Sequence, residues 1–117
     1  MSTIGPALSG IMAANTRLNV SAQNTANART PGYQPQQVVQ TATPAGVDAA
    51  KRPQSGGQFF IYEPDSPSAD HKGQVAMPAI DETTEMANQN EALNQFKANL
   101  QSLLAGDEMF KAALKIV

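Results

Sequence analysis

Both ends of this chain repeat at alternating steps of three and four residues, the spacing of a helix that packs along one face. The first repeat comprises Ile4, Leu8, Ile11, Asn15, Leu18, Ala22 and Thr25. It predicts a helix over residues 4–27 with the seam of a coiled coil. Asn27 is the expected cap, because the Thr30-Pro31-Gly32 sequence that follows forces an extended residue and then a turn.

The second repeat predicts a longer helix over residues 81–117. Asp81 is the expected N-cap, and Glu82 and Glu85 suit the positive end of the helix dipole. The seam comprises Met86, Gln89, Leu93, Phe96, Leu100, Leu103, Asp107, Phe110, Leu114 and Val117. Gly106 costs this helix roughly 1 kcal/mol relative to alanine and is a candidate bend. Because this helix is longer than the first, part of its seam needs a further partner.

The middle of the chain, residues 34–80, is interrupted by six prolines and a Gly-Gly pair. Short strands are predicted at residues 37–41, 58–62 and 74–77, and the only strong one is the Phe-Phe-Ile-Tyr run in residues 59–62. We expect a small hairpin or ribbon there. Residues 42–57 are expected to form a flexible loop.

These patterns divide the chain into residues 1–33, 34–80 and 81–117 and predict a mainly α fold. The two terminal helices pair as a coiled coil or bundle, and the middle is irregular with short strands. Leu, Ile, Val and Phe together supply 22 of the 117 residues. This share is just under one fifth, the level below which chains tend to be disordered. Such a chain is expected to complete its burial against partners rather than to fold as a self-sufficient enzyme.

Composition and motifs exclude several classes of function. The chain has no cysteine, and His71, its one histidine, lies in a charged stretch that does not complete a metal site. We expect no catalytic residue, metal, cofactor or small-molecule substrate. The net charge of −2 argues against nucleic acid binding. No apolar run is long enough to insert in a membrane, and we expect no cleavable signal peptide at the N-terminus.

Three segments resemble the bacterial flagellar basal-body rod protein family. Residues 22–33, Ala-Gln-Asn-Thr-Ala-Asn-Ala-Arg-Thr-Pro-Gly-Tyr, are similar to the A-x-N-I-A-N-x-x-T-P-G-Y signature of flagellar rod and hook proteins. Residues 62–78 are similar to the Y-x-P-x-x-P-x-A-x-x-x-G-x-V-x-x-P segment of the proximal rod branch, and residues 99–114 to its C-terminal helix.

Within the first of these segments, each residue type has a physical role of its own. The amides of Asn24 and Asn27 can bond neighbouring backbone groups. Pro31 and Gly32 fit a turn, in which Gly32 supplies a positive φ if the turn is type II. Tyr33 is expected to anchor the exit of the first helix, with its ring buried and its hydroxyl in water.

The resemblance implies a structural subunit of the proximal rod, the drive shaft inside the flagellar basal body. Its partners would be copies of itself and other rod proteins in a hetero-oligomeric helical assembly that transmits torque. It would reach the periplasm through the flagellar type III export apparatus without a cleaved signal. The residues expected at helix-packing and inter-subunit contacts are Ile4, Leu8, Ile11, Asn15, Leu18, Asn24, Asn27, Pro31, Gly32, Tyr33, Leu93, Phe96, Leu100, Leu103, Phe110 and Leu114.

Two alternatives stay open on the sequence. The chain could be another rod or hook component, although the segment 62–78 favours the proximal rod. It could instead be a coiled-coil adaptor, chaperone or effector of a type III secretion system. A rod subunit should polymerise or co-assemble with rod proteins, whereas an adaptor should form a small defined complex.

Overall fold

The structure, a computed structural model, describes residues 4–116. Val117, the last residue of the predicted second seam, and residues 1–3 of the predicted N-terminal segment lie outside the described residues. The elements follow one another as α1 (Ile4–Ala26), β1 (Gln36–Thr43), β2 (Gly46–Pro53), β3 (Gln58–Tyr62), β4 (Gln74–Pro78) and α2 (Glu82–Ile116). The molecule is elongated, with extents of 75 × 23 × 18 Å.

The two helices begin and end close to where the sequence predicts. Both the backbone N–H and the side-chain Nδ2 of Asn27 donate to the carbonyl of Gln23, at 3.0 and 2.9 Å, which caps the end of α1. At the start of α2, the carboxylate of Asp81 accepts the N–H of Thr83 at 3.0 Å. Both predicted caps are therefore confirmed. Gly106 lies inside α2, which continues through it unbroken.

The middle of the chain forms two β-hairpins. β1 pairs antiparallel with β2, and β3 pairs antiparallel with β4. The three predicted strands are confirmed, but the expectation of a flexible loop over residues 42–57 is wrong. β2 occupies half of that range although its Ala-Ala-Lys-Arg-Pro end has little intrinsic strand preference, because pairing with β1 and packing on α1 stabilise it.

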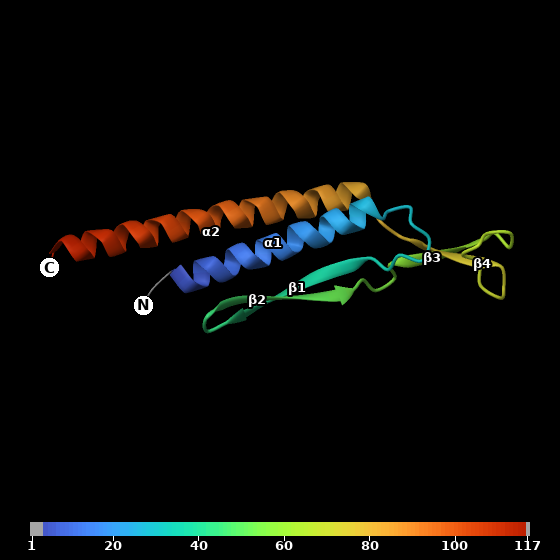
Figure 1. Ribbon diagram of the computed structural model, residues 1–117, viewed down its shortest axis with the longest axis horizontal. Helices are drawn as coiled ribbons and strands as arrows, with labels where there is room; N and C mark the ends of the chain where they lie inside the picture. The colour runs from blue at the N-terminus through green and yellow to red at the C-terminus, as the bar shows by residue number, and fades with distance from the viewer. Residues whose placement is uncertain (1–3, 117) are drawn as a thin grey trace.

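α1 lies between α2 and the β1–β2 hairpin (Figure 1). The helices run antiparallel and side by side, and the β3–β4 hairpin projects beyond them at the opposite end of the molecule from the helix termini Ile4 and Ile116 (Figure 1). The buried apolar side chains are few and mostly small: Ala7, Ala13, Ala14, Val20, Val75 and Ala92. No helix within residues 4–116 combines the length and the apolar character needed to cross a membrane.

Candidate functional site

The contact between the two helices is made by small and polar side chains. On α1 the buried positions include Ala7, Gly10, Ala14, Ser21 and Asn24, and on α2 the buried positions are Glu85 and Ala92. A Cβ atom at Gly10 would overlap the side-chain amide of Asn99, which would have to shift to make room. Small side chains at steps of three and four allow the helices to approach closely.

This contact is offset by one residue from the seams predicted from the sequence. The predicted members Leu8, Asn15, Leu93 and Leu100 are exposed, whereas their neighbours Ala7, Ala14 and Ala92 are buried. Coiled-coil packing of the two predicted seams is therefore not confirmed, since part of each seam is exposed and part is half-buried. The three-and-four periodicity of the apolar residues is present in both helices, but small and polar side chains occupy the buried positions of the contact.

The displaced apolar residues come together on one side of the helix pair. A step of one residue rotates a side chain by about 100° around its helix. Because α1 and α2 are antiparallel, the same step on both helices moves both sets to the same side. That side lies away from the β1–β2 hairpin, which borders Ala13 of α1 through Val47 and Ala49 and borders Val20 through Gln36 and Val38.

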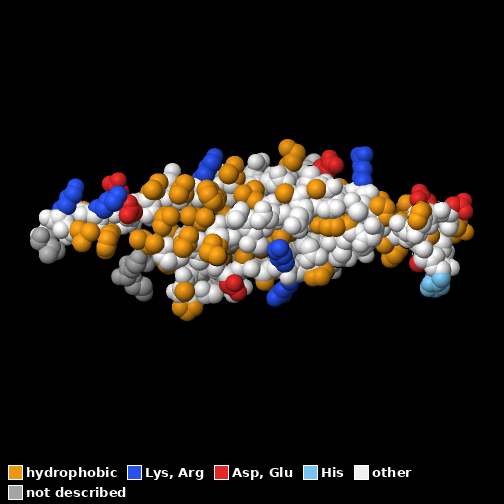
Figure 2. Space-filling model, viewed as in Figure 1, with side chains coloured by type: hydrophobic (Ala, Val, Ile, Leu, Met, Phe, Trp, Pro, Cys, Tyr) orange, Lys and Arg blue, Asp and Glu red, His pale blue; other side chains and the backbone are white. Residues whose placement is uncertain are grey.

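We call the exposed members of this set the apolar stripe: Leu8, Leu93, Leu100, Phe110 and Leu114. Their exposed fractions run from 36% at Leu100 to 60% at Phe110 and Leu114. Ile4 is also exposed, and Ile11, Leu18, Phe96 and Leu103 are half-buried. Figure 2 shows hydrophobic side chains gathered over the helices toward the C-terminal end of α2.

α2 extends well past the start of α1. Gly10 faces Asn99, so in an antiparallel pair Ile4 lies opposite the region of Ala105. Residues 106–116, which we call the overhang, therefore have no α1 beside them and span about 16 Å. Met109, Phe110, Leu114 and Ile116 are exposed there. The expectation that part of the longer helix lacks a partner within the chain is confirmed for the described residues.

Asn24 joins three parts of the fold at the other end of the helix pair. Its side chain is 2% exposed. Its Nδ2 donates to the carbonyl of Gln36 at 2.8 Å and to Oε1 of Glu85 at 3.3 Å. Its Oδ1 accepts the N–H of Gln36 at 3.0 Å and the hydroxyl of Tyr33 at 2.8 Å. All four hydrogen-bonding positions of the amide are thus used, and α1, α2, β1 and the turn between α1 and β1 are held together.

Glu85 and Tyr33 complete this joint. The hydroxyl of Ser21 donates to Oε2 of Glu85 at 2.6 Å, so both carboxylate oxygens have partners. Burial, and to a lesser extent the charge of Glu85, raises the pKa of Tyr33 above its ordinary value. The Tyr33 hydroxyl donates to Oδ1 of Asn24, a partner that the sequence analysis did not predict.

The turn that leaves α1 has the geometry that the sequence predicts. The N–H of Tyr33 donates to the carbonyl of Thr30 at 3.2 Å, and Gly32 has a φ of 81°. These features fit the type II turn expected from Pro31 and Gly32. Pro31 and Gly32 are exposed, and the N–H of Gly32 donates to the carbonyl of Ala76 at 2.8 Å. The turn therefore docks on the β3–β4 hairpin.

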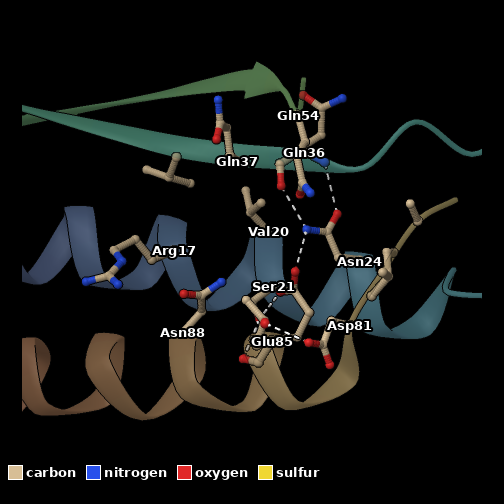
Figure 3. A pocket seen from close by; sticks show the side chains of 14 residues that line it. Arg17, Val20, Ser21, Asn24, Gln36, Gln37, Gln54, Asp81, Glu85 and Asn88 are labelled. Carbon is tan, nitrogen blue, oxygen red and sulfur yellow. Dashed lines mark hydrogen bonds between the residues drawn. The ribbon is translucent and has the colours of Figure 1, made fainter. Parts of the chain in front are cut away.

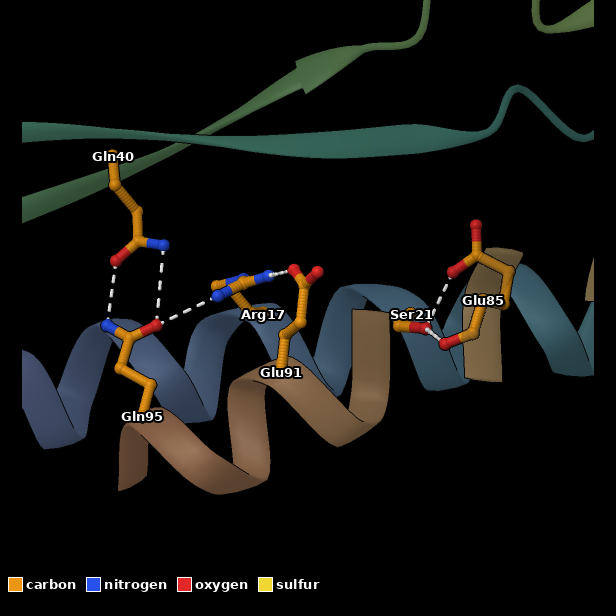
Figure 4. Close-up of polar contacts among 6 residues, drawn as sticks. All are labelled: Arg17, Ser21, Gln40, Glu85, Glu91 and Gln95. Atoms are coloured by element: carbon orange, nitrogen blue, oxygen red, sulfur yellow. Dashed lines mark hydrogen bonds and ion pairs between the residues drawn. The ribbon is translucent and has the colours of Figure 1, made fainter. Parts of the chain in front are cut away.

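A second polar connection lies midway along the helices. The Arg17 guanidinium donates to Oε1 of Gln95 and to Oε2 of Glu91, both at 2.9 Å. Gln95 also exchanges hydrogen bonds with the side chain of Gln40 on β1 (Figure 4). Gln95 therefore ties α2 both to α1 and to the hairpin. The sequence analysis did not single out Arg17, Ser21, Glu85 or Gln95 as contacts. Positions 10, 14, 17, 21 and 24 nevertheless follow alternating steps of four and three, and their small and polar residues indicate a second seam.

An open groove of about 420 Å³ borders the Asn24 joint (Figure 3). Its walls come from α1, the start of α2, β1 and the link between β4 and α2, and they include Arg17, Asn24, Gln36, Asp81 and Glu85. The polar walls and the open shape suit water or a neighbouring side chain better than an apolar ligand. Within residues 4–116, no three His, Cys, Asp or Glu side chains are grouped so as to hold a metal ion.

Comparison with known proteins gives one consistent result. The chain is 36% identical over 110 residues to the flagellar basal-body rod protein FlgC of Salmonella typhimurium, covering 81% of each chain. It is 37% identical over 108 residues to that of Agrobacterium fabrum, covering 80% of this chain and 77% of the relative. The FlgC of Aquifex aeolicus is 26% identical over 115 residues. No family model matches the chain.

Proposed function

Because the chain belongs to the FlgC family of flagellar basal-body rod proteins, we propose that it polymerises with copies of itself and with other rod proteins in the proximal rod and transmits torque there. Its terminal helices make the contacts. The subunit is exported by the flagellar type III apparatus and assembles in the periplasm. This role needs no cofactor, metal or catalytic residue.

The observation that carries this proposal is the uncovered apolar surface of the helices. Small side chains occupy the most buried positions between α1 and α2, and the residues of the apolar stripe stay 36–60% exposed in the single chain. Apolar patches of this kind mark protein–protein contact sites on soluble proteins. A lengthwise stripe and a projecting helix end also suit contacts between different surfaces of successive subunits, which generate helical tubes.

The polar joint supports the second half of the proposal. Asn24 and Gln95 connect both helices to the β1–β2 hairpin, so a twisting force applied to one element is passed to the others through bonded contacts. A subunit that carries torque needs such cross-links between its parts. Each contact is modest alone, and the load is shared across many copies.

The overhang provides the test, because its apolar residues contribute nothing to the helix pair of the same chain. Phe110→Ala with Leu114→Ala should abolish rod assembly and swimming. The helix content and melting temperature of the purified chain should stay close to the parent values. The matched control, Glu108→Ala with Lys115→Ala, changes two exposed charged side chains of the overhang and should assemble. Normal rods from the Phe110/Leu114 variant would refute the role of the overhang.

A further inference from the structure

The backbone register shows which edges of the two hairpins have unsatisfied groups. The N–H of Ala79 donates to the carbonyl of Gly57, and the N–H of Glu63 donates to that of Gly73. These bonds flank the β3–β4 ladder at both ends, so its bonded pairs involve the odd-numbered residues. In an antiparallel pair the alternate residues point their N–H and C=O outward. On β3 these are Gln58, Phe60 and Tyr62, and on β4 they are Gln74, Ala76 and Pro78.

The outer edge of β4 is covered by the chain itself. The N–H of Gln74 donates to Oδ1 of Asp70 at 3.0 Å, and the carbonyl of Gln74 accepts the N–H of Asp70 at 2.9 Å. The carbonyl of Ala76 accepts the N–H of Gly32. Pro78 has no N–H to offer. An incoming strand would therefore find three of the outward groups of β4 already bonded.

The two edges of the β1–β2 hairpin are protected in part. The N–H of Gln54 donates to the carbonyl of Pro35, which places Val47, Lys51 and Pro53 among the outward positions of β2. The N–H of Val47 is bonded to Ser9, and a lysine and a proline are common means of blocking a strand edge. On β1, both backbone groups of Gln36 are bonded to Asn24.

The outer edge of β3 has none of the blocking features that the other three edges show in part. Within residues 4–116, no hydrogen bond reaches the outward backbone groups of Phe60 or Tyr62. Neither a proline nor a charged side chain lies within β3. Phe60 and Tyr62 share one face of the hairpin and are 61% and 74% exposed. The strand therefore offers a row of free donors and acceptors beside two uncovered aromatic rings.

We propose that the outer edge of β3 binds an extended strand of a different protein chain, a neighbour in the rod, by adding it to the β3–β4 hairpin. This inference rests on the proposed function. The main-chain groups of Phe60 and Tyr62 pair with the incoming strand, and their rings pack against its apolar side chains at alternate positions.

The surrounding charge further specifies the partner. The loop after β3 carries the carboxylates of Glu63, Asp65 and Asp70 against the single lysine Lys72. Figure 2 shows acidic side chains gathered at this tip of the molecule. A strand laid along β3 ends beside Glu63 and Asp65, so the incoming strand carries a basic residue at that end.

A second copy of this chain does not fit the edge as well. The edges of β2 and β4 are blocked, and β1 is tied to α1 and, through Gln40, to α2. A second copy could offer its own β3, but that contact is two-fold symmetric and closes on itself. A growing rod needs contacts that continue, so the strand comes from a different chain.

Photocrosslinking in assembled rods tests the proposal. The amino acid p-benzoylphenylalanine replaces Tyr62 in the full chain, and the same probe at Ser68, in the exposed loop, is the positional control. Rods are isolated after irradiation, and mass spectrometry identifies the cross-linked segment. Phe60→Pro in the Tyr62 probe chain removes an outward N–H while leaving the β3–β4 bonds intact. Lys51→Pro makes the matched change on the blocked edge of β2.

We expect the probe at Tyr62 to join one short segment of a different protein, with a basic residue at one end. Phe60→Pro should abolish this product, and Lys51→Pro should leave it unchanged. A covalent dimer of this chain, a Tyr62 yield no higher than that at Ser68, or a product that persists in Phe60→Pro would each overturn the inference. Absence of the chain from isolated rods would refute the proposed function itself, and the inference with it.

Discussion

Replacing Asn24 with alanine removes the residue that holds α1, α2 and β1 together. The substitution leaves the N–H and C=O of Gln36, the hydroxyl of Tyr33 and one carboxylate oxygen of Glu85 without their present partner. Alanine itself is well tolerated in a helix. The effect on stability therefore reports the polar joint and not the helix.

The magnitude follows from the four bonds that are lost. Each bond contributes about 0.5–1.5 kcal/mol net to the free energy of unfolding. If nothing replaced the lost partners, the four bonds together would cost about 2–6 kcal/mol. The joint borders the open groove of about 420 Å³, so water can replace some partners. We therefore expect a loss of about 2–3 kcal/mol, in the lower part of that range. At about 4 °C per kcal/mol for a chain of this size, the melting temperature should fall by about 10 °C.

Urea and thermal unfolding followed by far-UV circular dichroism measure this loss. Asn15→Ala is the matched control, because Asn15 is an exposed asparagine in the same helix. It should leave stability unchanged or raise it by about 0.5 kcal/mol. Asn24→Asp keeps the shape of the side chain but replaces both donor bonds with repulsion, so it should cost at least as much as Asn24→Ala. If Asn24→Ala and Asn15→Ala unfold at the same urea concentration, the joint does not stabilise the fold.

Two further predictions concern the exit from α1. Since burial raises the pKa of Tyr33, the neutral phenol favours the fold, and stability should be intact below about pH 10 and fall as the pH rises through the raised value; Tyr33→Phe should remove this alkaline loss in melting curves at pH 8 and 11. Gly32→Val and Gly56→Val should each cost about 1–3 kcal/mol in thermal denaturation, because both glycines have a positive φ (81° and 66°). The loss should be larger at Gly32, whose N–H also binds Ala76, and a smaller loss at Gly32 than at Gly56 would contradict this interpretation.

The helices and most of the strands could be predicted because their signals are local. Asp81 and Asn27 mark helix ends through side-chain bonds to backbone groups within four residues, and such bonds depend on little else. β2 could not be predicted, because its alanines and charged residues favour a strand only when β1 and α1 are beside it. The strand is a product of tertiary packing.

The site residues divide in the same way. Asn24 could be singled out from its signature, but its partners Glu85 and Gln36 are distant in the sequence and give no local signal. For the seams, periodicity identified the apolar residues but not what they contact. A repeat with steps of three and four fits two neighbouring faces of a helix equally well. The choice between them depends on how closely Gly10 and Ala14 allow α2 to approach, and this is a property of the pair.

The antiparallel pairing of the first and last helices also determines the order of folding. The hydrogen bonds that join them link residues 61 to 85 positions apart, as between Asn24 and Glu85 or Gly10 and Gln95. Closing so long a loop is slow, whereas each hairpin pairs residues that are near in sequence. A chain that leaves a narrow channel with its N-terminus first can therefore form its hairpins early. α1 cannot pair with α2 until the last third of the chain has emerged.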